Sequence, residues 1–292
     1  MEARISGTTK TYGLIGSPVG HSGSPAMYNY SFQRLGIDSA YLAWDIQKDQ
    51  VADFMQAART LKIQGFNVTM PCKTEVARQV DELSPAAQII GAVNTVVAKE
   101  GRWIGHITDG VGFLLNLKDH GVEIGGKKIV LLGGGGAGTA ILTQAALDGA
   151  GEIAVFNRKS PNFEKLEEIS KKLREMTPQC PVIVCDLAEE DLLYQKIREC
   201  DILINSTNVG MCPREEESLV KDLSVYRKDL VVADIIYNPK ETKMMRDAKA
   251  AGVEKIVGGK GMLLWQGAEA FRLYTGLEMP VAEVKERYFR ED

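Results

Sequence analysis

The glycine-rich stretch at residues 131–140 (LLGGGGAGTA) constrains this chain more than any other feature of its sequence. A run of branched aliphatic residues leads into four consecutive glycines, and an alanine- and leucine-rich helical pattern follows them. That order predicts a strand, a tight turn and a helix, with Gly133, Gly135 and Gly138 at the spacings of a dinucleotide-binding fingerprint. The helix start would offer unpaired N–H groups and a positive dipole end to a phosphate. A run of glycines also suits a plain flexible turn, so the rest of the chain has to decide between the two interpretations.

Strand-like and helix-like segments alternate along the whole chain. Before the glycine turn, strands are expected at residues 12–15, 41–46, 66–70, 89–97 and 102–107, the last two joined by a hairpin turn at 99–101. Helices are expected there from about residue 25, over 51–62, over 72–80 and over 110–117. After the turn, strands are expected at 153–156, 181–185, 202–205 and 230–236, and helices at 162–176 and 262–276.

This alternation predicts an α/β fold with mostly parallel sheets, and the 292 residues suffice for two domains. We expect an α/β substrate-binding catalytic domain formed by residues 1–110 together with 261–292. Residues 111–260 are expected to form a Rossmann-type doubly wound parallel sheet, because a βαβαβ order starts at the glycine turn.

The net charge of −4 offers no broad basic field, so small molecules are expected as partners and nucleic acid is not. No apolar run is long enough for a membrane span, and the start, MEARISGTTKTYG, lacks the apolar core of a signal peptide. We therefore expect a cytoplasmic protein. The five cysteines include no CxxC pair, which argues against a disulfide framework and against a zinc site, and we expect no bound metal. Cys72 is interpreted as a buried bystander thiol.

Polar residues recur where the predicted strands of the first domain end. They are Ser22, Ser24, Asn67, Thr69, Lys73, Asn94, Thr95, Thr108 and Asp109. Because ligands of open α/β sheets bind outside the carboxyl ends of the strands, these side chains are expected to face one pocket for a polyol or hydroxy acid. Taken singly, each also has a structural interpretation: the two serines and Asp109 as helix caps, and Asn94 as a turn residue.

Eight ordered motifs resemble the shikimate dehydrogenase family, including its quinate/shikimate dehydrogenase branch. In chain order they are GSPVGHSGSP (16–25), NVTMPCK (67–73), GAVNT (91–95), TDG (108–110), the glycine turn at 133, FNR (156–158), YNP (237–239) and GGKGMLLWQG (258–267). They cover nearly the whole chain. The resemblance implies a reversible, nicotinamide-dependent oxidation of shikimate to 3-dehydroshikimate on the route to aromatic amino acids, or the matching reaction on quinate.

The resemblance also assigns roles to individual residues. It implies that Lys73 and Asp109 are the catalytic pair, which fits proton exchange with a reacting hydroxyl as hydride moves. It implies six substrate-binding residues: Ser22, Ser24, Thr69, Asn94, Tyr237 and Gln266. It implies cofactor binding by Gly133, Gly134, Gly135, Gly136, Ala137, Gly138, Asn157, Arg158, Lys159, Ser160, Thr207, Met211, Gly259 and Met262.

Two departures from the family pattern bear on function. The family usually has Asn before the TD of its TDG motif, and Ile107 stands there. His106 beside it is interpreted as a surface histidine, with replacement of the lost hydrogen bond as the alternative. After the second strand of the nucleotide domain, an acid would favour NAD and an arginine the 2′-phosphate of NADP. Arg158 and Lys159 favour NADP, whereas Ser160 replaces an Asp found in branch members that use NAD.

Several alternatives stay open from the sequence. The substrate could be shikimate, quinate or a related cyclic hydroxy acid, because one hydroxyl or carboxylate contact decides among them. A catalytically weak, ligand-binding regulator could share this fold, although Lys73 and Asp109 are both retained. A methyltransferase also has a glycine turn on a parallel sheet, but it would need a different substrate domain. The sequence is compatible with a monomer or a homodimer.

Overall fold

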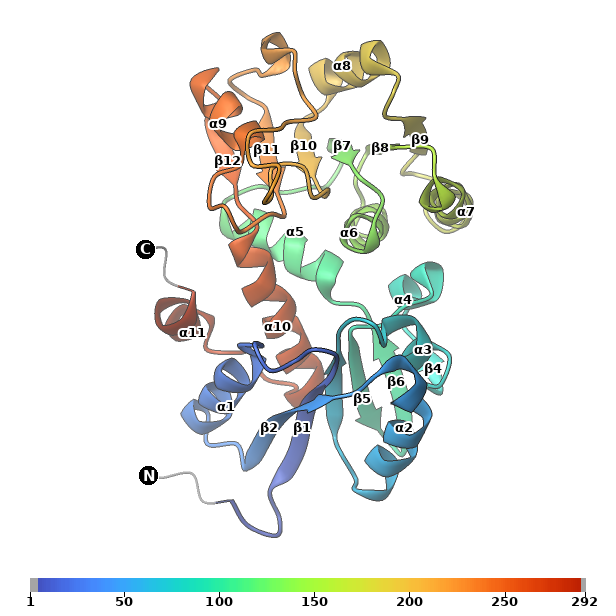
Figure 1. The fold of residues 1–292 in the computed structure, drawn as a ribbon, viewed down its shortest axis with the longest axis vertical. Coiled ribbons are helices and arrows are strands. Elements are labelled where there is room, and N and C mark those ends of the chain that lie inside the picture. The colour runs from blue at the N-terminus through green and yellow to red at the C-terminus, as the bar shows by residue number, and fades with distance from the viewer. Residues whose placement is uncertain (1–4, 290–292) are drawn as a thin grey trace. The chain divides into compact units, whose positions relative to one another are not determined.

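A computed structural model of the chain describes residues 5–289. Among these residues the chain forms two compact units (Figure 1). The first unit takes in the chain up to Thr108 and again from Leu264, and the second takes in Asp109–Leu263. Within the described residues each unit contains one six-stranded sheet. The structural units thus change at 108/109 and 263/264, where the sequence had placed the domain boundaries at 110/111 and 260/261.

The sheet of the first unit is mixed, with the strand order β2-β1-β3-β5-β6-β4. Its strands are β1 (Lys10–Gly16), β2 (Ser39–Asp45), β3 (Gly65–Val68), β4 (Glu82–Leu83), β5 (Thr95–Lys99) and β6 (Arg102–His106). The strands β1, β2 and β3 run parallel, and β5 is antiparallel to both β3 and β6. The helices are α1 (Ser24–Arg34), η1 (Lys48–Gln50), α2 (Val51–Thr60), α3 (Lys73–Ala77), α4 (Pro85–Ile90) and α11 (Val281–Tyr288), with the later part of α10 (Lys260–Thr275).

The expected strand at 89–97 is wrong over its first half. Residues 89 and 90 close the helix α4, which Ser84 caps through a hydrogen bond to its third residue and in which proline takes the first position. Gly91 then ends the helix in the left-handed region, at φ 71°. The apolar run IIGAV suits a buried helix end as well as a strand, and the proline, the serine cap and the glycine decide for the helix.

The core of the first unit is an aromatic cluster that includes residues from both ends of the chain. Tyr28 of α1 stacks on Tyr41 of β2 with the ring centroids 4.4 Å apart, and Phe271 of α10 lies on the same cluster. The Tyr28 hydroxyl donates to the carbonyl of Gly267 at 3.1 Å. A Cβ at Gly267 would lie 2.5 Å from the terminal methyl of Met27, so the glycine allows α10 to approach α1 closely. The C-terminal helix therefore completes the first unit.

The sheet of the second unit is entirely parallel, with the order β12-β11-β10-β7-β8-β9. Its strands are β7 (Lys128–Leu132), β8 (Glu152–Asn157), β9 (Val182–Asp186), β10 (Ile202–Asn205), β11 (Val231–Asp234) and β12 (Lys255–Val257). The helices are α5 (Asp109–Asp119), α6 (Gly136–Leu147), α7 (Pro161–Met176), α8 (Glu190–Glu199), η2 (Leu223–Val225) and α9 (Lys243–Ala250), together with the start of α10.

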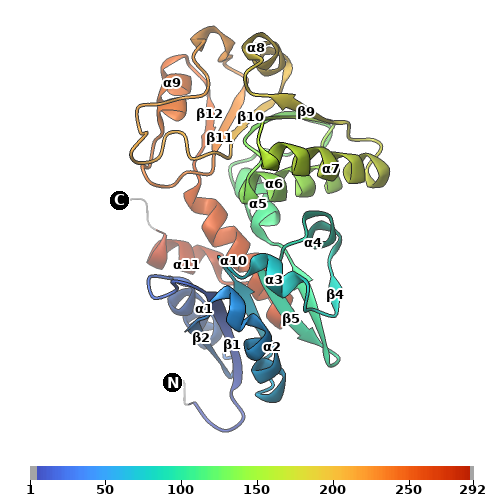
Figure 2. The ribbon, with the colours of Figure 1, turned by 45° about the vertical axis from the view of Figure 1, so that its right-hand side comes forward.

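This sheet has helices on both faces, as Figures 1 and 2 show. The helices α8 and α9 share one face with a continuous apolar core, and α6 packs between α5 and α7 on the other. The strand order reverses between β7 and β10, which is the switch point of a doubly wound sheet. Because both faces are covered, the strands are continuous apolar runs rather than alternating ones. The predicted fold class is confirmed.

The structure also bears on the expectations about cysteines, membrane spans and metal sites. All five cysteines are free thiols, and Cys72 is buried, with its thiol donating to the carbonyl of Ile46 at 3.2 Å. Burial raises the pKa of the Cys72 thiol, which makes it a poor nucleophile. Within residues 5–289 no helix is long and apolar enough to cross a bilayer. No group of three or more His, Cys, Asp or Glu in that range is placed to hold a metal ion. Residues 1–4 of the start discussed above lie outside the described residues.

Candidate active site

Four segments of the first unit meet at one edge of its sheet. The parallel strands β1 and β3 end there, the antiparallel β5 begins there, and β6 ends there. Backbone hydrogen bonds tie the segments together: Ser17 N–H donates to Met70 O at 2.9 Å, and Val68 N–H donates to Asn94 O at 2.8 Å. Asn94 N–H in turn donates to His106 O at 2.9 Å. The segments that follow these strands are therefore gathered at one edge, and that their polar side chains face one pocket stays a prediction.

Gly16 allows the loops after β1 and β3 to come close. Its φ of 145° lies in the region that favours glycine. A Cβ there would lie 2.4 Å from the Thr69 methyl and 2.7 Å from Met70 O. Thr69 N–H donates to Ile15 O at 2.8 Å, which fixes Thr69 next to this contact. The conformation of Gly16 thus sets the position of a predicted substrate-binding residue.

Asn94 is a buried amide, 4% exposed, that organises the segment leading to Asp109. Its Oδ1 accepts from Thr108 N–H at 2.8 Å, and its Nδ2 donates to Thr108 Oγ1 at 3.1 Å. The neighbouring Thr95 hydroxyl also donates to Asn94 Oδ1, at 3.1 Å. A turn residue needs no such burial, so the amide has a larger structural role than the turn interpretation gave it.

Asn67 continues this polar network beneath the same edge. Its Nδ2 donates to Asn94 O at 3.2 Å and to Thr95 Oγ1 at 3.1 Å, and its Oδ1 accepts from the Tyr41 hydroxyl at 2.7 Å. Burial raises the pKa of Tyr41, so the phenol stays protonated and keeps this hydrogen bond. The buried network links the aromatic core to the sheet edge. It thereby holds the edge in one arrangement.

The two predicted catalytic residues open two helices. Lys73 is the first residue of α3, and its carbonyl accepts from Val93 N–H at 3.1 Å. Asp109 is the first residue of α5 and directly follows Thr108, whose amide and hydroxyl are both bonded to Asn94. Ile107 is buried, and His106 lies near Glu269 and Arg272, while burial lowers its pKa.

The remaining predicted substrate residues lie on other segments. The N-cap of α1 is Gly23 and carries no side-chain cap bond, so the capping interpretation of Ser22 and Ser24 is wrong. The Ser22 hydroxyl instead accepts from Ser24 N–H at 3.2 Å within the loop after β1. Gln266 lies on α10 directly before Gly267, which contacts α1. Tyr237 lies in the second unit, after β11, and is 56% exposed.

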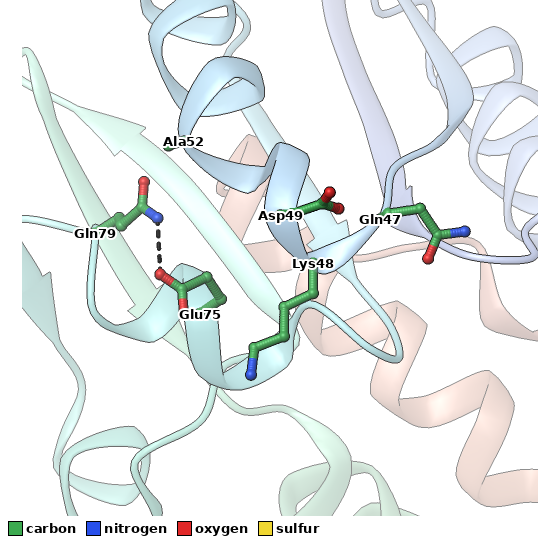
Figure 3. Close-up of a pocket in the computed structure, with 6 residues that line it drawn as sticks. All are labelled: Gln47, Lys48, Asp49, Ala52, Glu75 and Gln79. Carbon is green, nitrogen blue, oxygen red and sulfur yellow. Dashed lines mark hydrogen bonds between the residues drawn. The ribbon is translucent and has the colours of Figure 1, made fainter.

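A hollow of about 540 Å³ lies in the first unit beside this edge (Figure 3). It is lined by Gln47, Lys48, Asp49, Ala52, Glu75 and Gln79. Gln47 Nε2 donates to Ser17 Oγ at 2.7 Å, which connects the hollow to the loop after β1. The hydrogen bond from Gln79, then the hydrogen bond and the charge of Arg78, keep the pKa of Glu75 below its usual range. None of the predicted site residues lines this hollow.

In the second unit the three fingerprint glycines occupy different environments. Gly133 has φ 97°, and a Cβ there would lie 2.6 Å from the Thr207 methyl. A Cβ at Gly138 would lie 2.4 Å from Gly133 O, so this glycine lets α6 pack against the turn. Gly135 is exposed and has no atom within 4 Å of a Cβ position, which leaves its backbone open to a ligand. Gly133 thus suits the tight turn of the fingerprint, Gly138 the packing of the helix, and Gly135 the approach of a ligand to the backbone.

A pocket of about 260 Å³ adjoins this turn. It is lined by Gly133, Gly134, Gly135, Phe156, Asn157, Arg158, Asn162, Leu187, Ser206, Thr207, Asn208, Val209, Arg214 and Leu219. Asn157 joins the turn to β8, because its Oδ1 accepts from Gly134 N–H at 3.2 Å. Glycine backbone, a helix N-terminus and Arg158 together suit a phosphorylated nucleotide.

Part of the predicted cofactor set lies outside this lining. These residues are Gly136, Ala137, Gly138, Lys159, Ser160, Met211, Gly259 and Met262. The Lys159 ammonium lies over the Phe163 ring at 3.8 Å, and Ser160 is the N-cap residue of α7. A Cβ at Gly259 would lie 2.0 Å from Ile235 O, which gives this glycine a packing reason of its own.

Sequence reasoning missed Ser206 and Arg214, which irregular segments contribute, and Asp234 at the end of β11. Ser206 Oγ donates to Leu132 O at 2.9 Å and to Gly133 O at 2.8 Å, which holds the glycine turn against the end of β10. Its position directly after the apolar run ILIN was a usable signal. Arg214 lies in a long loop without periodicity, where no sequence signal singled it out.

Asp234 is a fully buried carboxylate at the end of β11. It accepts from Asn205 Nδ2 at 3.0 Å, from Thr242 Oγ1 at 2.8 Å and from Ile236 N–H at 2.9 Å. Burial raises the pKa of Asp234 to about 6, against the lowering effect of these hydrogen bonds. Asn205 also accepts from the Thr207 hydroxyl at 2.7 Å, so the carboxylate supports the loop that lines the pocket.

Comparison with known proteins agrees with this geometry. Residues 14–96 match the family described as shikimate dehydrogenase substrate binding domain, and residues 259–287 match the shikimate 5'-dehydrogenase C-terminal domain. The shikimate dehydrogenase (NADP(+)) of Streptococcus uberis is 45% identical over 293 aligned positions, which cover 100% of this chain and 99% of that protein. The chain belongs to the shikimate dehydrogenase family.

Solved structures of shikimate dehydrogenase relatives share the fold. The shikimate 5-dehydrogenase of Listeria monocytogenes, in complex with shikimate and NAD, is 43% identical with a TM-score of 0.93, over 97% of both chains. The quinate dehydrogenase of Corynebacterium glutamicum, in complex with NAD, is 28% identical with a TM-score of 0.83, over 96% of this chain and 99% of that one. This shikimate dehydrogenase family member is thus more similar to the shikimate enzymes of Streptococcus uberis and Listeria monocytogenes than to that quinate enzyme.

Proposed function

We propose that this protein is an NADP-dependent shikimate dehydrogenase, which reversibly oxidises shikimate to 3-dehydroshikimate in aromatic amino acid biosynthesis. The observation that carries the proposal is the 45% identity across the full chain with an enzyme named for shikimate and NADP(+). The polar sheet edge of the first unit and the glycine-lined pocket of the second support it. The quinate alternative has less support, because the quinate relative is 28% identical.

The second unit fits a nicotinamide dinucleotide. Gly133, Gly134 and Gly135 offer backbone to the pyrophosphate, and Asn157 and Arg158 offer polar groups to the adenosine ribose and a 2′-phosphate. When bound, the cofactor accepts or supplies the hydride. The lining residues include arginine and no acid for ribose hydroxyls, which supports NADP over NAD.

The proposed substrate residues lie mostly in the first unit, while Asp109 and Tyr237 belong to the second. We propose that Lys73 and Asp109 exchange a proton with the reacting hydroxyl, as the resemblance to the family implies, because an amine and a carboxylate can both serve as general acid or base. The remaining six predicted residues bind the other groups of the substrate. Ser22 and Ser24 hold the carboxylate, and Thr69, Asn94, Tyr237 and Gln266 contact the ring hydroxyls.

An absorbance assay at the nicotinamide band tests the activity, with shikimate and quinate each paired with NADP and NAD. We expect the fastest reduction with shikimate and NADP. Faster turnover of quinate would show that quinate is the substrate, and faster reduction of NAD would show that NAD is the cofactor. No reduction in any of the four combinations would reject the enzyme and favour a ligand-binding regulator.

The role of Lys73 has its own test. We expect Lys73→Ala to lower kcat by about 100-fold or more while the protein stays folded and binds shikimate, because general acid–base catalysis contributes about that much. Lys48→Ala is the matched control, since Lys48 lines the neighbouring hollow and belongs to no predicted site. Near-normal kcat in Lys73→Ala would remove Lys73 from the mechanism.

We place the enzyme in a reducing compartment such as the cytoplasm, because its five cysteines are free thiols. Its proposed partners are the small-molecule substrate and cofactor alone, and the chain is proposed to act as a monomer or homodimer. Analytical ultracentrifugation distinguishes these two states, and a larger assembly would contradict both.

A further inference from the structure

Arg214 is the second arginine that lines the nucleotide pocket of the second unit. It lies in the loop between β10 and β11, while Arg158 lies directly after β8, so two separate segments contribute the two charges. Among the described residues that line the pocket, these two are the only charged ones, and none is a carboxylate. The pocket therefore presents an excess of positive charge.

The backbone fixes Arg214 at this position. Its N–H donates to Met211 O at 2.7 Å, and its carbonyl accepts from Gly210 N–H and from Glu217 N–H, each at 3.1 Å. Gly210, at φ 100°, makes the tight loop possible. Three backbone hydrogen bonds within a short loop give the side chain a defined origin. The loop itself therefore needs no ordering when a ligand binds, and only the side chain has to adjust.

The guanidinium of Arg214 is paired with Glu217. Arg214 Nε and Nη2 both bond to Glu217 Oε2, at 2.9 Å and 2.6 Å. The two side chains are 38% and 53% exposed, and an ion pair with that exposure contributes little net stability. A phosphate dianion can therefore share or take over the guanidinium at low cost.

We propose that Arg214 is a specificity-determining residue that binds the 2′-phosphate of NADP together with Arg158. This inference rests on the proposed function, since it assumes that the pocket holds the adenosine half of the cofactor. A phosphate monoester carries nearly two negative charges, and one exposed arginine neutralises only part of them. The planar donor fork of a second arginine supplies the remaining charge and hydrogen bonds.

Isothermal titration calorimetry with NADP⁺, NAD⁺, 2′,5′-ADP and 5′-ADP tests the inference without relying on turnover. We expect Arg214→Gln to weaken NADP⁺ and 2′,5′-ADP by about tenfold or more, because hydrogen bonds to charged groups have about that effect. Binding of NAD⁺ and 5′-ADP should change by less than about twofold. Arg214→Lys should retain part of the preference, since it keeps the charge and loses the fork.

Arg246→Gln is the matched control. Arg246 Nη2 bonds to both carboxylate oxygens of Glu216 at 2.8 Å, so this variant removes the same charge and a tie to the same loop. Arg246 does not line the pocket, and its variant should keep the preference for the phosphorylated ligands. An equal loss with all four ligands in Arg214→Gln would mean that the side chain contacts the adenine or the pyrophosphate, and it would overturn the inference. An unchanged preference would overturn it too.

The wild-type protein separates this inference from the proposed function. If the wild type does not prefer NADP⁺ to NAD⁺, the proposed cofactor is wrong before any variant is measured. If it does prefer NADP⁺, the variants decide on Arg214 alone. Raising the salt concentration should reduce the preference in the wild type more than in Arg214→Gln, because screening weakens the contribution of the exposed charge.

Discussion

Replacing Gly138 by alanine should destabilise the second unit, whereas the same replacement at Gly135 should mainly affect cofactor binding. A Cβ at position 138 would lie 2.4 Å from Gly133 O, which is backbone, and 2.6 Å from Ser206 Oγ, which its hydrogen bonds hold in place. To relieve the contact, α6 has to shift away from the glycine turn. The shift would also weaken the two hydrogen bonds of Ser206, to Leu132 O and Gly133 O.

The size of the effect follows from these contacts. Overpacking against fixed atoms costs about 2 kcal/mol. The single hydroxyl proton of Ser206 is shared between the two carbonyls, so weakening this bond adds about 1 kcal/mol, and the unfolding free energy should fall by about 3 kcal/mol in Gly138→Ala. For a unit of the size of Asp109–Leu263 that corresponds to a decrease in Tm of roughly 10 °C. At Gly135 no atom lies within 4 Å of the added methyl, and the loss of an N-cap glycine costs about 1 kcal/mol or less.

Thermal unfolding can be followed separately in the two units. All three tryptophans, Trp44, Trp103 and Trp265, lie in the first unit, so their fluorescence follows that unit while far-UV circular dichroism follows both. We expect Gly138→Ala to lower the transition seen by circular dichroism more than the transition seen by fluorescence. Gly135→Ala should leave both nearly unchanged and weaken NADP binding about tenfold or more. Equal decreases in Tm for the two variants would refute this reasoning.

Two further predictions follow from buried groups. Asp234→Asn should lower the unfolding free energy by about 2 kcal/mol near neutral pH, because an amide cannot accept all three hydrogen bonds that the carboxylate accepts. Burial raises the pKa of Asp234 to about 6 from an ordinary value of 3.8. Between these two pH values the native state therefore keeps a proton on Asp234 that the unfolded chain has lost. The stability advantage of the wild type over Asp234→Asn should therefore fall as pH rises from about 4 to about 6, which denaturant titrations across that range can measure; an advantage that rises with pH there would contradict the raised pKa. Gly16→Ala should cost about 2 kcal/mol and raise the KM for shikimate by displacing Thr69, whereas Gly20→Ala, with open space around its Cβ position, should leave stability nearly unchanged. An unaltered KM in Gly16→Ala would show that Thr69 does not depend on this contact.

Much of the fold could be predicted because the second unit consists of buried parallel strands. The run ILIN was expected as a strand over 202–205, and it is β10 over the same residues. Such strands are continuous apolar segments, and a strictly local pattern identifies them. By contrast, β4 (Glu82–Leu83) and β12 (Lys255–Val257) were not predicted, because such short strands are defined by the neighbour they pair with. Local sequence carries little information about that pairing.

In the candidate site, too, residues with a local sequence signal could be predicted, and residues placed by contacts with other segments could not. The glycine turn and the polar residues after β1 and β3 could be predicted, because a strand end followed by a polar residue or a glycine is a local signal. Arg214 could not, because backbone hydrogen bonds inside an irregular loop bring it to the pocket. Asp234 was passed over inside the apolar run LVVADII, although a carboxylate in such a run needs buried donors. The roles of the individual site residues stay predictions until the variants are measured.

The discontinuous make-up of the first unit has a consequence for synthesis on the ribosome. The second unit is one uninterrupted stretch, Asp109–Leu263, and all of its strands are present once that stretch has emerged. The aromatic core of the first unit has to wait for Phe271 and Tyr274, which are translated near the end of the chain. Until then Tyr28 and Phe32 of α1 lack their partners from α10 and expose apolar surface, although they were translated early. The nascent chain should therefore depend on chaperones mainly through its N-terminal part, until the helix α10 has emerged and that core can close.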